Sequence, residues 1–402
     1  MDDRLYYQDA YTRSFSAEVT KTGVEQDGTP FVVLSQTAFY PTGGGQPSDL
    51  GVLGDMCVVD VEEVEGEIRH RLESPLSENI AEVTGHIDWE RRFDHMQQHA
   101  GQHILSASFL EVVQAETVAF HLGKERVTID VRLDELTADV WEQVENRANQ
   151  IVLENHPIIA RFVDDEELAA LPLKKQPTVT ENIRVVMIPE FDYNPCGGTH
   201  PARTGEVGII KILGWERHRG NIRLEFICGW RALRDYNQKQ AVVREAAKLL
   251  ATNEGELIAQ TERLLAERDT LKAKLAEVDK LLLEVEVNQQ LSEASQMGNS
   301  RLIMRTFTDK TIQQLQQFAQ LATALAPDAI CLLAATGEKM QVVFARGQEV
   351  NVAINQVLKE TLPIIEGKGG GNPAMAQGGG QPLVEAEEVL LHARKLLEAS
   401  LT

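Results

Sequence analysis

The chain reads WERRFDHMQQHAGQHILSASFLEVV over residues 89–113, and this stretch decides how the protein is organised. Its apolar residues recur at about 3.6-residue spacing, which predicts a helix with one apolar face. They are Phe93, Met96, Ala100, Ile104, Ala107 and Val112. The residues before it instead alternate apolar and polar side chains in short runs broken by glycine turns, which is the strand pattern. The change of period at Trp89 therefore predicts a domain boundary.

On either side of this boundary the chain predicts two different architectures. Residues 1–88 read as short strands around a glycine-rich loop, which is typical of a small β-barrel or a strongly twisted sheet. Residues 89–235 continue from the helix into a strand at 126–133, a helix at 136–155 and mixed strand segments. That order predicts an α+β domain.

Residues 236–298 are rich in Ala, Glu, Lys, Leu and Arg and predict long helices that link two domains. Six apolar residues recur seven apart, at Leu250, Leu257, Leu264, Leu271, Val278 and Val285. Gly255, preceded by the capping residue types Thr252 and Asn253, is expected to separate two helices. A two-stranded coiled coil needs a second apolar position in each heptad, and here the second row of positions begins with polar residues. A coiled coil and a helical hairpin are therefore both possible arrangements.

Residues 299–402 predict a separate α/β domain. AICLLAAT (329–336) and KMQVVFAR (339–346) read as adjacent strands, followed by a helix over 350–362. The glycine-rich run GKGGGNPAMAQGGG occupies 367–380, and a final helix is expected over 383–399. The whole chain is thus expected to be an α+β protein: small N-terminal β-barrel, α+β domain, helical or coiled-coil linker, and C-terminal α/β glycine-rich domain.

The charge balance of the chain varies strongly by region. With 402 residues, 43% of them hydrophobic, the chain can bury several cores, which excludes disorder as its main state. Its net charge of −22 argues against nucleic acid as a partner. However, residues 51–90 alone hold 11 acidic residues against two arginines, whereas residues 201–235 have a net charge of +3. A nucleic acid could therefore still bind along a narrow basic track.

Four dispersed cysteines and an N-terminus without an export signal predict a reducing compartment, so the cytoplasm is the expected location. No stretch approaches 18 uninterrupted apolar residues, so we expect no membrane span.

Two pairs of potential metal ligands stand far apart in the sequence. His99 and His103, four residues apart, share one face of the predicted helix. Cys196 and His200 flank a Gly-Gly turn and add a thiolate and a third imidazole. Together they form the tetrahedral donor set that Zn²⁺ prefers.

The spacing of these ligands excludes the common zinc motifs. Residues 100–102 are Ala-Gly-Gln, so the glutamate base of a His-Glu-x-x-His protease is missing, and the spacing is not that of a zinc finger. Four protein ligands leave no open position for water, so a structural zinc is the alternative to a catalytic one. His95, one turn before His99, is expected to be a solvated helix residue, with a supporting or RNA-facing role as the alternative.

Four motifs in this order resemble the editing half of alanyl-tRNA synthetase. They are TAFYPTGGGQPSDLG (37–51), HAGQH (99–103), CGGTHPARTGEVGIIKI (196–212) and GKGGGNPAMAQGGG (367–380). With no aminoacylation domain ahead of them, they resemble the free-standing alanyl-tRNA editing proteins of the AlaX type, in the large form. The resemblance covers nearly the whole chain.

This resemblance implies a zinc-dependent, trans-editing aminoacyl-tRNA hydrolase. Its substrate would be mischarged Ser-tRNA(Ala), with Gly-tRNA(Ala) as a second substrate. His99, His103, Cys196 and His200 take the zinc-ligand positions, and Gln46 ends the glycine loop of the expected catalytic site. Thr37 falls where the family has a threonine that senses the serine hydroxyl, although a turn-capping role explains the residue equally well.

The resemblance also places tRNA contacts in two regions. Arg203, Lys211, Arg217 and Arg219 lie in the locally basic stretch, for which a solvated surface is the alternative. Lys368, Gly369, Gly370 and Gly371 lie in the terminal glycine run, which the resemblance assigns to a tRNA-contacting domain associated with DHH-type phosphoesterases. The run lacks the Gly-Lys-Ser/Thr ending of a nucleotide-binding loop.

Two other functions compete with this one. A non-catalytic tRNA-binding module would retain zinc for folding, and an editing domain of threonyl-tRNA synthetase specificity would act on a different tRNA. The intact ligand set and the Cys-Gly-Gly-Thr-His motif favour the alanine-specific enzyme. A homodimer through the helical and C-terminal regions is also expected from the resemblance.

Overall fold

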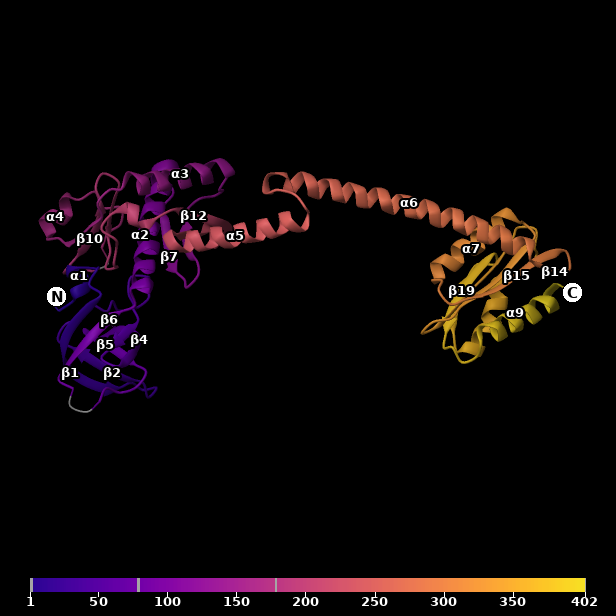
Figure 1. The fold of residues 1–402 in the computed structure, drawn as a ribbon, viewed down its shortest axis with the longest axis horizontal. Helices are drawn as coiled ribbons and strands as arrows, with labels where there is room; N and C mark the ends of the chain where they lie inside the picture. Colours follow the sequence, from indigo (N-terminus) through magenta and orange to yellow (C-terminus); the bar gives the residue numbers. More distant parts are fainter. Residues whose placement is uncertain (1–2, 78–79, 178, 402) are drawn as a thin grey trace. The chain divides into compact units, whose positions relative to one another are not determined.

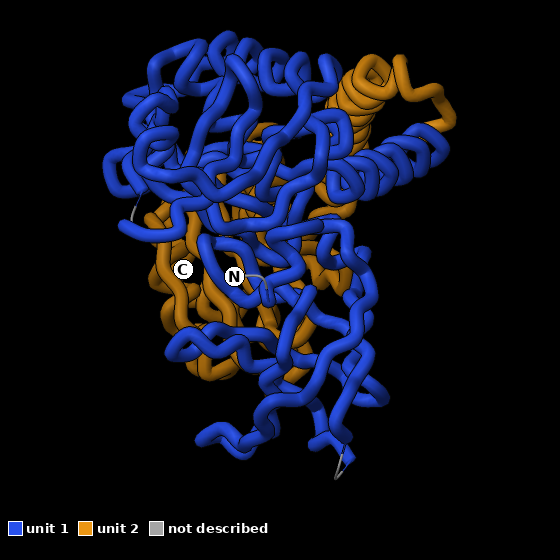
Figure 2. The backbone as a smooth tube through the Cα atoms, turned by 90° about the vertical axis from the view of Figure 1, so that its left-hand side faces the viewer, with its two compact units in different colours: residues 1–249 blue, residues 250–402 orange. Residues whose placement is uncertain are grey.

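The computed structural model describes residues 3–77, 80–177 and 179–401 (Figure 1). The chain divides into two compact units, residues 1–249 and 250–402 (Figure 2). The four predicted ranges 1–88, 89–235, 236–298 and 299–402 are finer than this division and stay predictions. Among the described residues, none of the helices is long and apolar enough to cross a membrane.

The N-terminal strands close into the predicted small barrel, after a short helix α1 (Leu5–Gln8). The strands are β1 (Ser14–Val24), β2 (Pro30–Leu34), β3 (Gly51–Leu53), β4 (Met56–Val64), β5 (Glu67–Leu72) and β6 (Glu82–Ile87). They pair in the order β1-β2-β5-β4-β3-β6. Alternate residues point inward, so that Phe15, Val32 and Leu72 fill the barrel interior.

Helix α2 (Trp89–Val113) follows the barrel directly and confirms the predicted helix. It begins at Asp88, whose side chain accepts a hydrogen bond from the Arg91 backbone N–H. The prediction of one apolar face was too narrow, because polar residues of the helix such as Gln98 and His103 are buried as well. The helix is enclosed because it contacts α3, α5 and strands of both neighbouring sheets. Its buried polar side chains are therefore available to build a site.

Two antiparallel sheets complete the predicted α+β part of the first unit. One has four strands in the order β12-β13-β8-β7, and the other has three in the order β11-β10-β9. The strands are β7 (Thr117–Leu122), β8 (Val127–Val131), β9 (Ile159–Phe162), β10 (Arg184–Ile188), β11 (Asp192–Pro195), β12 (Ile210–His218) and β13 (Asn221–Cys228). Helices α3 (Ala138–Glu154) and α4 (Asp165–Ala170) and the 3₁₀ turn η1 (Thr204–Val207) connect them.

A buried ion pair joins α2 to the barrel. Arg92 and Asp49 are both fully buried, and the Arg92 guanidinium donates hydrogen bonds to both Asp49 carboxylate oxygens. It also donates to the backbone carbonyls of Ala10 and Ala38. The same carboxylate accepts the Tyr40 backbone N–H. Because every partner lies in the N-terminal 50 residues, this pair fixes the start of α2 relative to the barrel.

The helical region divides between the two units. Helix α5 (Gly229–Leu249) belongs to the first, whereas η2 (Glu254–Glu256) and α6 (Leu257–Ser292) belong to the second. Gly255 lies between the two long helices as predicted, inside η2, and the Asn253 side chain caps this short turn by accepting the Glu256 backbone N–H. Leu264, Leu271, Val278 and Val285 of the heptad row are 38–66% exposed. The coiled coil, the hairpin and the homodimer all stay predictions.

The second unit forms the predicted α/β domain around a six-stranded sheet in the order β14-β15-β16-β17-β19-β18. Its strands are β14 (Ser295–Met297), β15 (Ser300–Phe307), β16 (Ala329–Ala335), β17 (Met340–Arg346), β18 (Lys368–Gly371) and β19 (Met375–Gly380). Its helices are α7 (Ile312–Leu325), α8 (Ile354–Thr361), the 3₁₀ turn η3 (Leu362–Ile365) and α9 (Ala386–Leu401).

The glycine-rich run is an edge hairpin of this sheet. β18 pairs only with β19, and a Cβ on Gly369 or Gly371 would lie 2.3 Å from a backbone oxygen of that neighbouring strand. The glycines thus allow the two strands to approach closely, which accounts for a glycine run inside a sheet.

Candidate metal centre

The four predicted ligands converge at one point of the first unit. His99 and His103 come from adjacent turns of α2, while Cys196 and His200 come from the turn that follows β11. Their ligand atoms all lie within 4.8 Å of one another. The pairs are about 90 residues apart in the sequence, so only the packing of β11 against α2 brings them together.

The spacing of these atoms fits a tetrahedral zinc ion. Cys196 Sγ lies 3.5 Å from His99 Nε2 and 3.3 Å from His200 Nε2. Zinc bonds of about 2.0–2.3 Å in tetrahedral geometry separate ligand atoms by roughly 3.3–3.6 Å. Burial alone would raise the pKa of Cys196, but His99 and His200 hold it well below its usual value. The thiolate that a metal requires is therefore the favoured form.

Gln46 positions His99. Its Oε1 accepts a hydrogen bond from His99 Nδ1 at 2.9 Å, which leaves Nε2 of the same ring for a metal. Its Nε2 donates to Thr199 Oγ1 at 2.8 Å, and the Thr199 backbone N–H donates to its Oε1. Gln46 thus connects the glycine loop of the barrel, α2 and the Cys-Gly-Gly-Thr-His turn, and acts on the site through His99.

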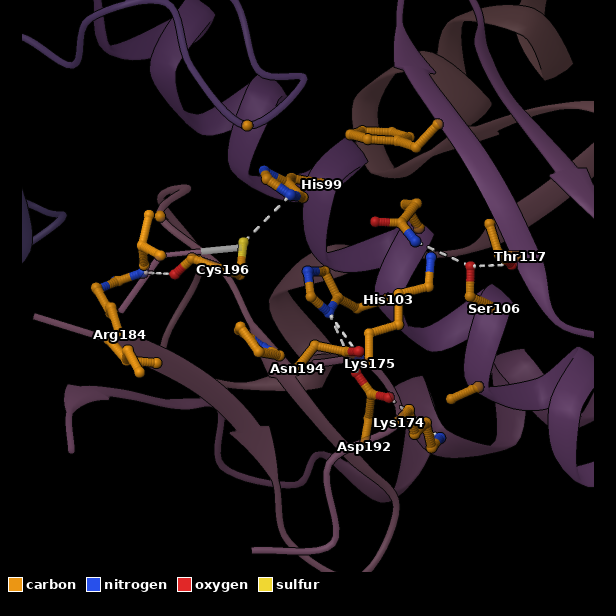
Figure 3. A pocket seen from close by; sticks show the side chains of 18 of the residues that line it. His99, His103, Ser106, Thr117, Lys174, Lys175, Arg184, Asp192, Asn194 and Cys196 are labelled. Atoms are coloured by element: carbon orange, nitrogen blue, oxygen red, sulfur yellow. Dashed lines mark hydrogen bonds and ion pairs between the residues drawn. The ribbon is translucent and has the colours of Figure 1, made fainter. Parts of the chain in front are cut away.

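Asp192 positions His103 as Gln46 positions His99. The sequence pattern did not predict this residue. Its Oδ2 accepts from His103 Nδ1 at 3.1 Å, and Lys174 Nζ lies 3.1 Å from its Oδ1 (Figure 3). Burial opposes ionisation, but these partners lower the pKa of Asp192, which therefore remains a carboxylate. A carboxylate behind a ligating histidine fixes the ring and makes it a better ligand. The available signal was its position four residues before Cys196.

The Gly-Gly turn carries Cys196 close against α2. A Cβ on Gly198 would lie 2.3 Å from His99 Cε1, so only glycine fits there. Arg184, buried under the turn, donates from Nη1 to the carbonyl oxygens of Cys196 and Gly198 at 2.9 and 2.8 Å. The two hydrogen bonds from Arg184 and the close contact of Gly198 with His99 thus hold the turn in place against α2.

A cavity of about 740 Å³, the large cavity, opens beside the four ligands. His99, His103 and Cys196 line it, whereas His200 does not (Figure 3). Phe120 stacks on the His99 ring with 5.3 Å between the ring centroids. Among the other lining residues, Gln102 and Thr117 both donate hydrogen bonds to Ser106 Oγ. The cavity therefore combines a metal-binding floor, an aromatic wall and a polar wall.

Thr37 is placed differently from the other predicted residues. It is buried, it does not line the large cavity, and its hydroxyl accepts the Phe39 backbone N–H at 3.1 Å. Burial lowers the pKa of His70 to about 4, so this ring is neutral. Its Nδ1 donates to the Val32 carbonyl, and its Nε2 therefore accepts the Thr37 hydroxyl proton at 2.7 Å. The hydroxyl thus has partners within the barrel.

The predicted tRNA contacts fall on several surfaces. Lys211, Arg217 and Arg219 lie on or next to β12, at the opposite edge of the four-stranded sheet from β7, which lines the large cavity. Lys211 is paired with Glu145 at 2.5 Å, and Arg203 donates to the Asn155 carbonyl. In the second unit, Lys368 and the glycines 369–371 are exposed on the edge strand β18.

Ion pairs offset the net charge that was counted between residues 201 and 235. Arg223 binds Asp130, Arg231 binds Asp94 and Arg234 lies 3.2 Å from Glu90. None of these acidic partners lies in the same stretch of sequence. A count along the chain could not include them, so this surface is less basic than the count indicated.

Comparisons with known proteins agree with this architecture. Residues 183–225 match the family described as the threonyl and alanyl tRNA synthetase second additional domain. The matched segment contains β10 to β12 and the first part of β13, and with them Cys196 and His200. The fold and the four-ligand site thus define a protein of the class that carries this synthetase-associated domain.

Full-length relatives narrow the class further. The chain is 34% identical over 387 residues to the alanyl-tRNA editing protein AlaX-L of Pyrococcus horikoshii, covering 94% of both chains. It is 30% identical to the alanine–tRNA ligase of Pyrococcus abyssi, covering 98% of this chain but 43% of the ligase. The crystal structure of the C-Ala domain of Aquifex aeolicus alanyl-tRNA synthetase matches 26% of the chain at 25% identity, with a TM-score of only 0.24. The chain belongs to the alanyl-tRNA editing protein family, in its large AlaX form.

Proposed function

We propose that this protein is a trans-editing aminoacyl-tRNA deacylase that hydrolyses Ser-tRNA(Ala), and also Gly-tRNA(Ala), with a zinc ion in the four-ligand site. The observation that carries the proposal is the convergence of three imidazoles and one thiolate on the floor of a cavity. Family membership supports alanine tRNA as the carrier, since the relatives named above are alanyl-tRNA editing proteins or alanine–tRNA ligases.

The large cavity is suited to an aminoacyl ester of a terminal adenosine. Its 740 Å³ falls in the range of small-molecule sites, and its aromatic walls suit a base or sugar. The ester is already activated, so hydrolysis requires an oriented water and a positive or hydrogen-bonding centre for the developing oxyanion. Zinc bound by these four residues would supply that centre, or would hold the amino group or ribose of the substrate.

Neighbouring side chains fix the orientation of the ligand histidines before the substrate binds. Gln46 and Asp192 each bind the Nδ1 of one ligand histidine, so both rings present Nε2 to the same point. The three histidine ligands are buried, and this low exposure strengthens the electrostatic interactions at the ester. The remaining polar groups on the cavity wall can orient the water.

Editing is useful because a synthetase pocket rejects an extra hydroxyl by only about a hundredfold. A second site that hydrogen-bonds the serine hydroxyl rejects alanine, since alanine leaves the polar group of that site unpaired. The assay that tests the proposal measures release of serine from Ser-tRNA(Ala), with Ala-tRNA(Ala) as the reference substrate. Serine release well above that of alanine supports the enzyme, whereas binding of tRNA without turnover supports the non-catalytic module.

The role of Thr37 has its own test. If its hydroxyl senses the substrate, Thr37→Val lowers the ratio of seryl to alanyl hydrolysis by about tenfold or more, as expected for one lost hydrogen bond to a buried polar group. The matched control is Thr20→Val, an exposed threonine of β1 whose hydroxyl donates to the Val33 carbonyl. An unchanged ratio in a less stable protein would show that the Thr37 hydroxyl has a structural role only, through its hydrogen bonds with His70 and Phe39.

A further inference from the structure

A second cavity, of about 440 Å³, lies in the first unit and is called the small cavity here. It contains none of the four metal ligands. Its lining residues are Pro47, Asp88, Glu90, Arg91, Asp94, His95, Gly123, Lys124, Arg231 and Arg234. Nothing in the proposed hydrolysis uses these side chains, so the cavity needs a separate explanation.

The two cavities follow one another along the same three segments of chain. The glycine loop lines the large cavity with Gly44 and the small one with Pro47. In the same way, residues 117–120 line the large cavity and residues 123–124 the small one, and α2 lines both. Phe120, stacked on His99, is the last residue of this run that lines the large cavity, and a Cβ on Gly45 would lie 2.9 Å from its ring.

The spacing between His95 and His99 on α2 is comparable to the spacing of nucleotides along a nucleic-acid strand. His95 lines the small cavity four residues before His99, which is about 6 Å along the helix axis. Along the axis of a duplex one strand advances by roughly 3.4 Å per nucleotide, and successive phosphates, which also wind around that axis, lie further apart than this. One or two nucleotides therefore cover the distance along α2 between His95, which lines the small cavity, and His99, which lines the large one.

The small cavity offers uncommitted positive charge. Asp94 is already bound by Arg231 through hydrogen bonds of 2.6–3.1 Å, and the Asp88 carboxylate caps α2. Arg91 donates its Nε to the Ser48 carbonyl, and its two terminal nitrogens have no partner among the described residues. Lys124 is exposed and likewise has no hydrogen bond or ion pair in the described part of the chain.

His95 adds a buried ring nitrogen without a partner. The side chain is 4% exposed rather than solvated, which corrects the expectation from sequence, and its Nδ1 has no hydrogen-bond partner. Burial, aided by the charge of Arg91, lowers the pKa of His95 to about 3. The ring is therefore neutral and can donate one hydrogen bond. A buried polar atom without a partner is costly, and an anion that accepted from it would remove that cost.

We propose that the small cavity binds a backbone phosphate of the single-stranded 3′ end of the tRNA whose ester occupies the large cavity. Lys124 and Arg91 would contact the phosphate oxygens, and His95 would donate its ring N–H. This inference rests on the proposed function, because it takes the ester in the large cavity as given. It explains how an acidic protein selects an RNA end beside its metal centre without a broadly basic surface.

The test compares two substrates in wild type and in Lys124→Gln. For Ser-tRNA(Ala), the variant is expected to raise KM by about tenfold with a much smaller change in kcat. The dependence of log(kcat/KM) on log salt should become shallower by about 0.7, the value for one phosphate contact on a single strand. For seryl-adenosine, which has no backbone phosphate, the effect should be absent, so the ratio of the two efficiencies falls.

Lys21→Gln is the matched control, because it removes one exposed charge from the barrel and lines neither cavity. Equal kinetics of Lys124→Gln and this control on tRNA would overturn the proposal, as would equal losses on both substrates. Thermal stabilisation of wild type by inorganic phosphate, lost in Lys124→Gln while KM for tRNA stays unchanged, would assign the cavity to a free anion instead. Failure of the wild type to hydrolyse either ester would contradict the proposed function, which is a separate outcome.

Discussion

Cys196→Ala is expected to lower the rate of seryl-tRNA(Ala) hydrolysis by at least about a hundredfold, because loss of even an outer partner of a metal ligand costs 10–100-fold in metal affinity or activity. Cys196 supplies the only thiolate among the four ligands, and its sulfur contacts two of the three imidazoles. The measurements are single-turnover deacylation and zinc content per chain.

Protein stability provides a second readout for the same variant. A bound metal stabilises the folded state, so a chelator should lower the melting temperature of the wild type but leave that of Cys196→Ala unchanged. Cys57→Ala is the matched control, since this cysteine is exposed and lies outside the site. If Cys196→Ala retained one zinc per chain and normal activity, the four residues would not form the zinc centre of the enzyme.

Asp49→Ala is expected to destabilise the first unit by about 3–5 kcal/mol, because it leaves a buried guanidinium without its counter-charge. Arg92 is fully buried, and no solvent can replace the carboxylate. The effect should also reach the metal centre, since Arg92 fixes α2 about two turns before His99 and about three turns before His103. The measurement is urea-induced unfolding followed by tryptophan fluorescence, which reports the first unit because all four tryptophans lie within residues 1–249.

Glu225→Ala provides the comparison for this prediction. Glu225 pairs with Arg126 on the surface, where the two side chains are 40% and 59% exposed. Exposed pairs contribute about 0–1 kcal/mol, so little change is expected. If Asp49→Ala were as mild as this control, the Arg92–Asp49 pair would not hold α2 against the barrel.

Local patterns in the sequence predicted many of the elements, and they singled out the four residues that the fold brings together at the candidate metal centre. The 3.6-residue period after Trp89 located α2, the alternating runs before it located the barrel strands, and Gly255 located the break before α6. His99 and His103 could be paired because helix geometry alone places them on one face. Cys196 and His200 could be added because their residue types suit zinc.

Contacts between distant segments could not be predicted in this way. His95 has the same helical pattern as a surface residue, yet its side chain is enclosed by elements that the pattern does not reveal. Lys211 looked available for RNA, but its partner Glu145 comes from α3, 66 residues earlier in the chain. The glycine run had no strand pattern, because its glycines serve close contact between β18 and β19 and have no side chains to alternate.

The most direct test of the central claim is hydrolysis of Ser-tRNA(Ala) by the wild-type chain before and after removal of zinc. We expect about one zinc per chain, loss of serine release when a chelator removes the metal, and recovery when zinc is returned. Ala-tRNA(Ala) should remain largely intact throughout. Full turnover by zinc-free protein, or no turnover by the zinc-loaded protein, would contradict the account.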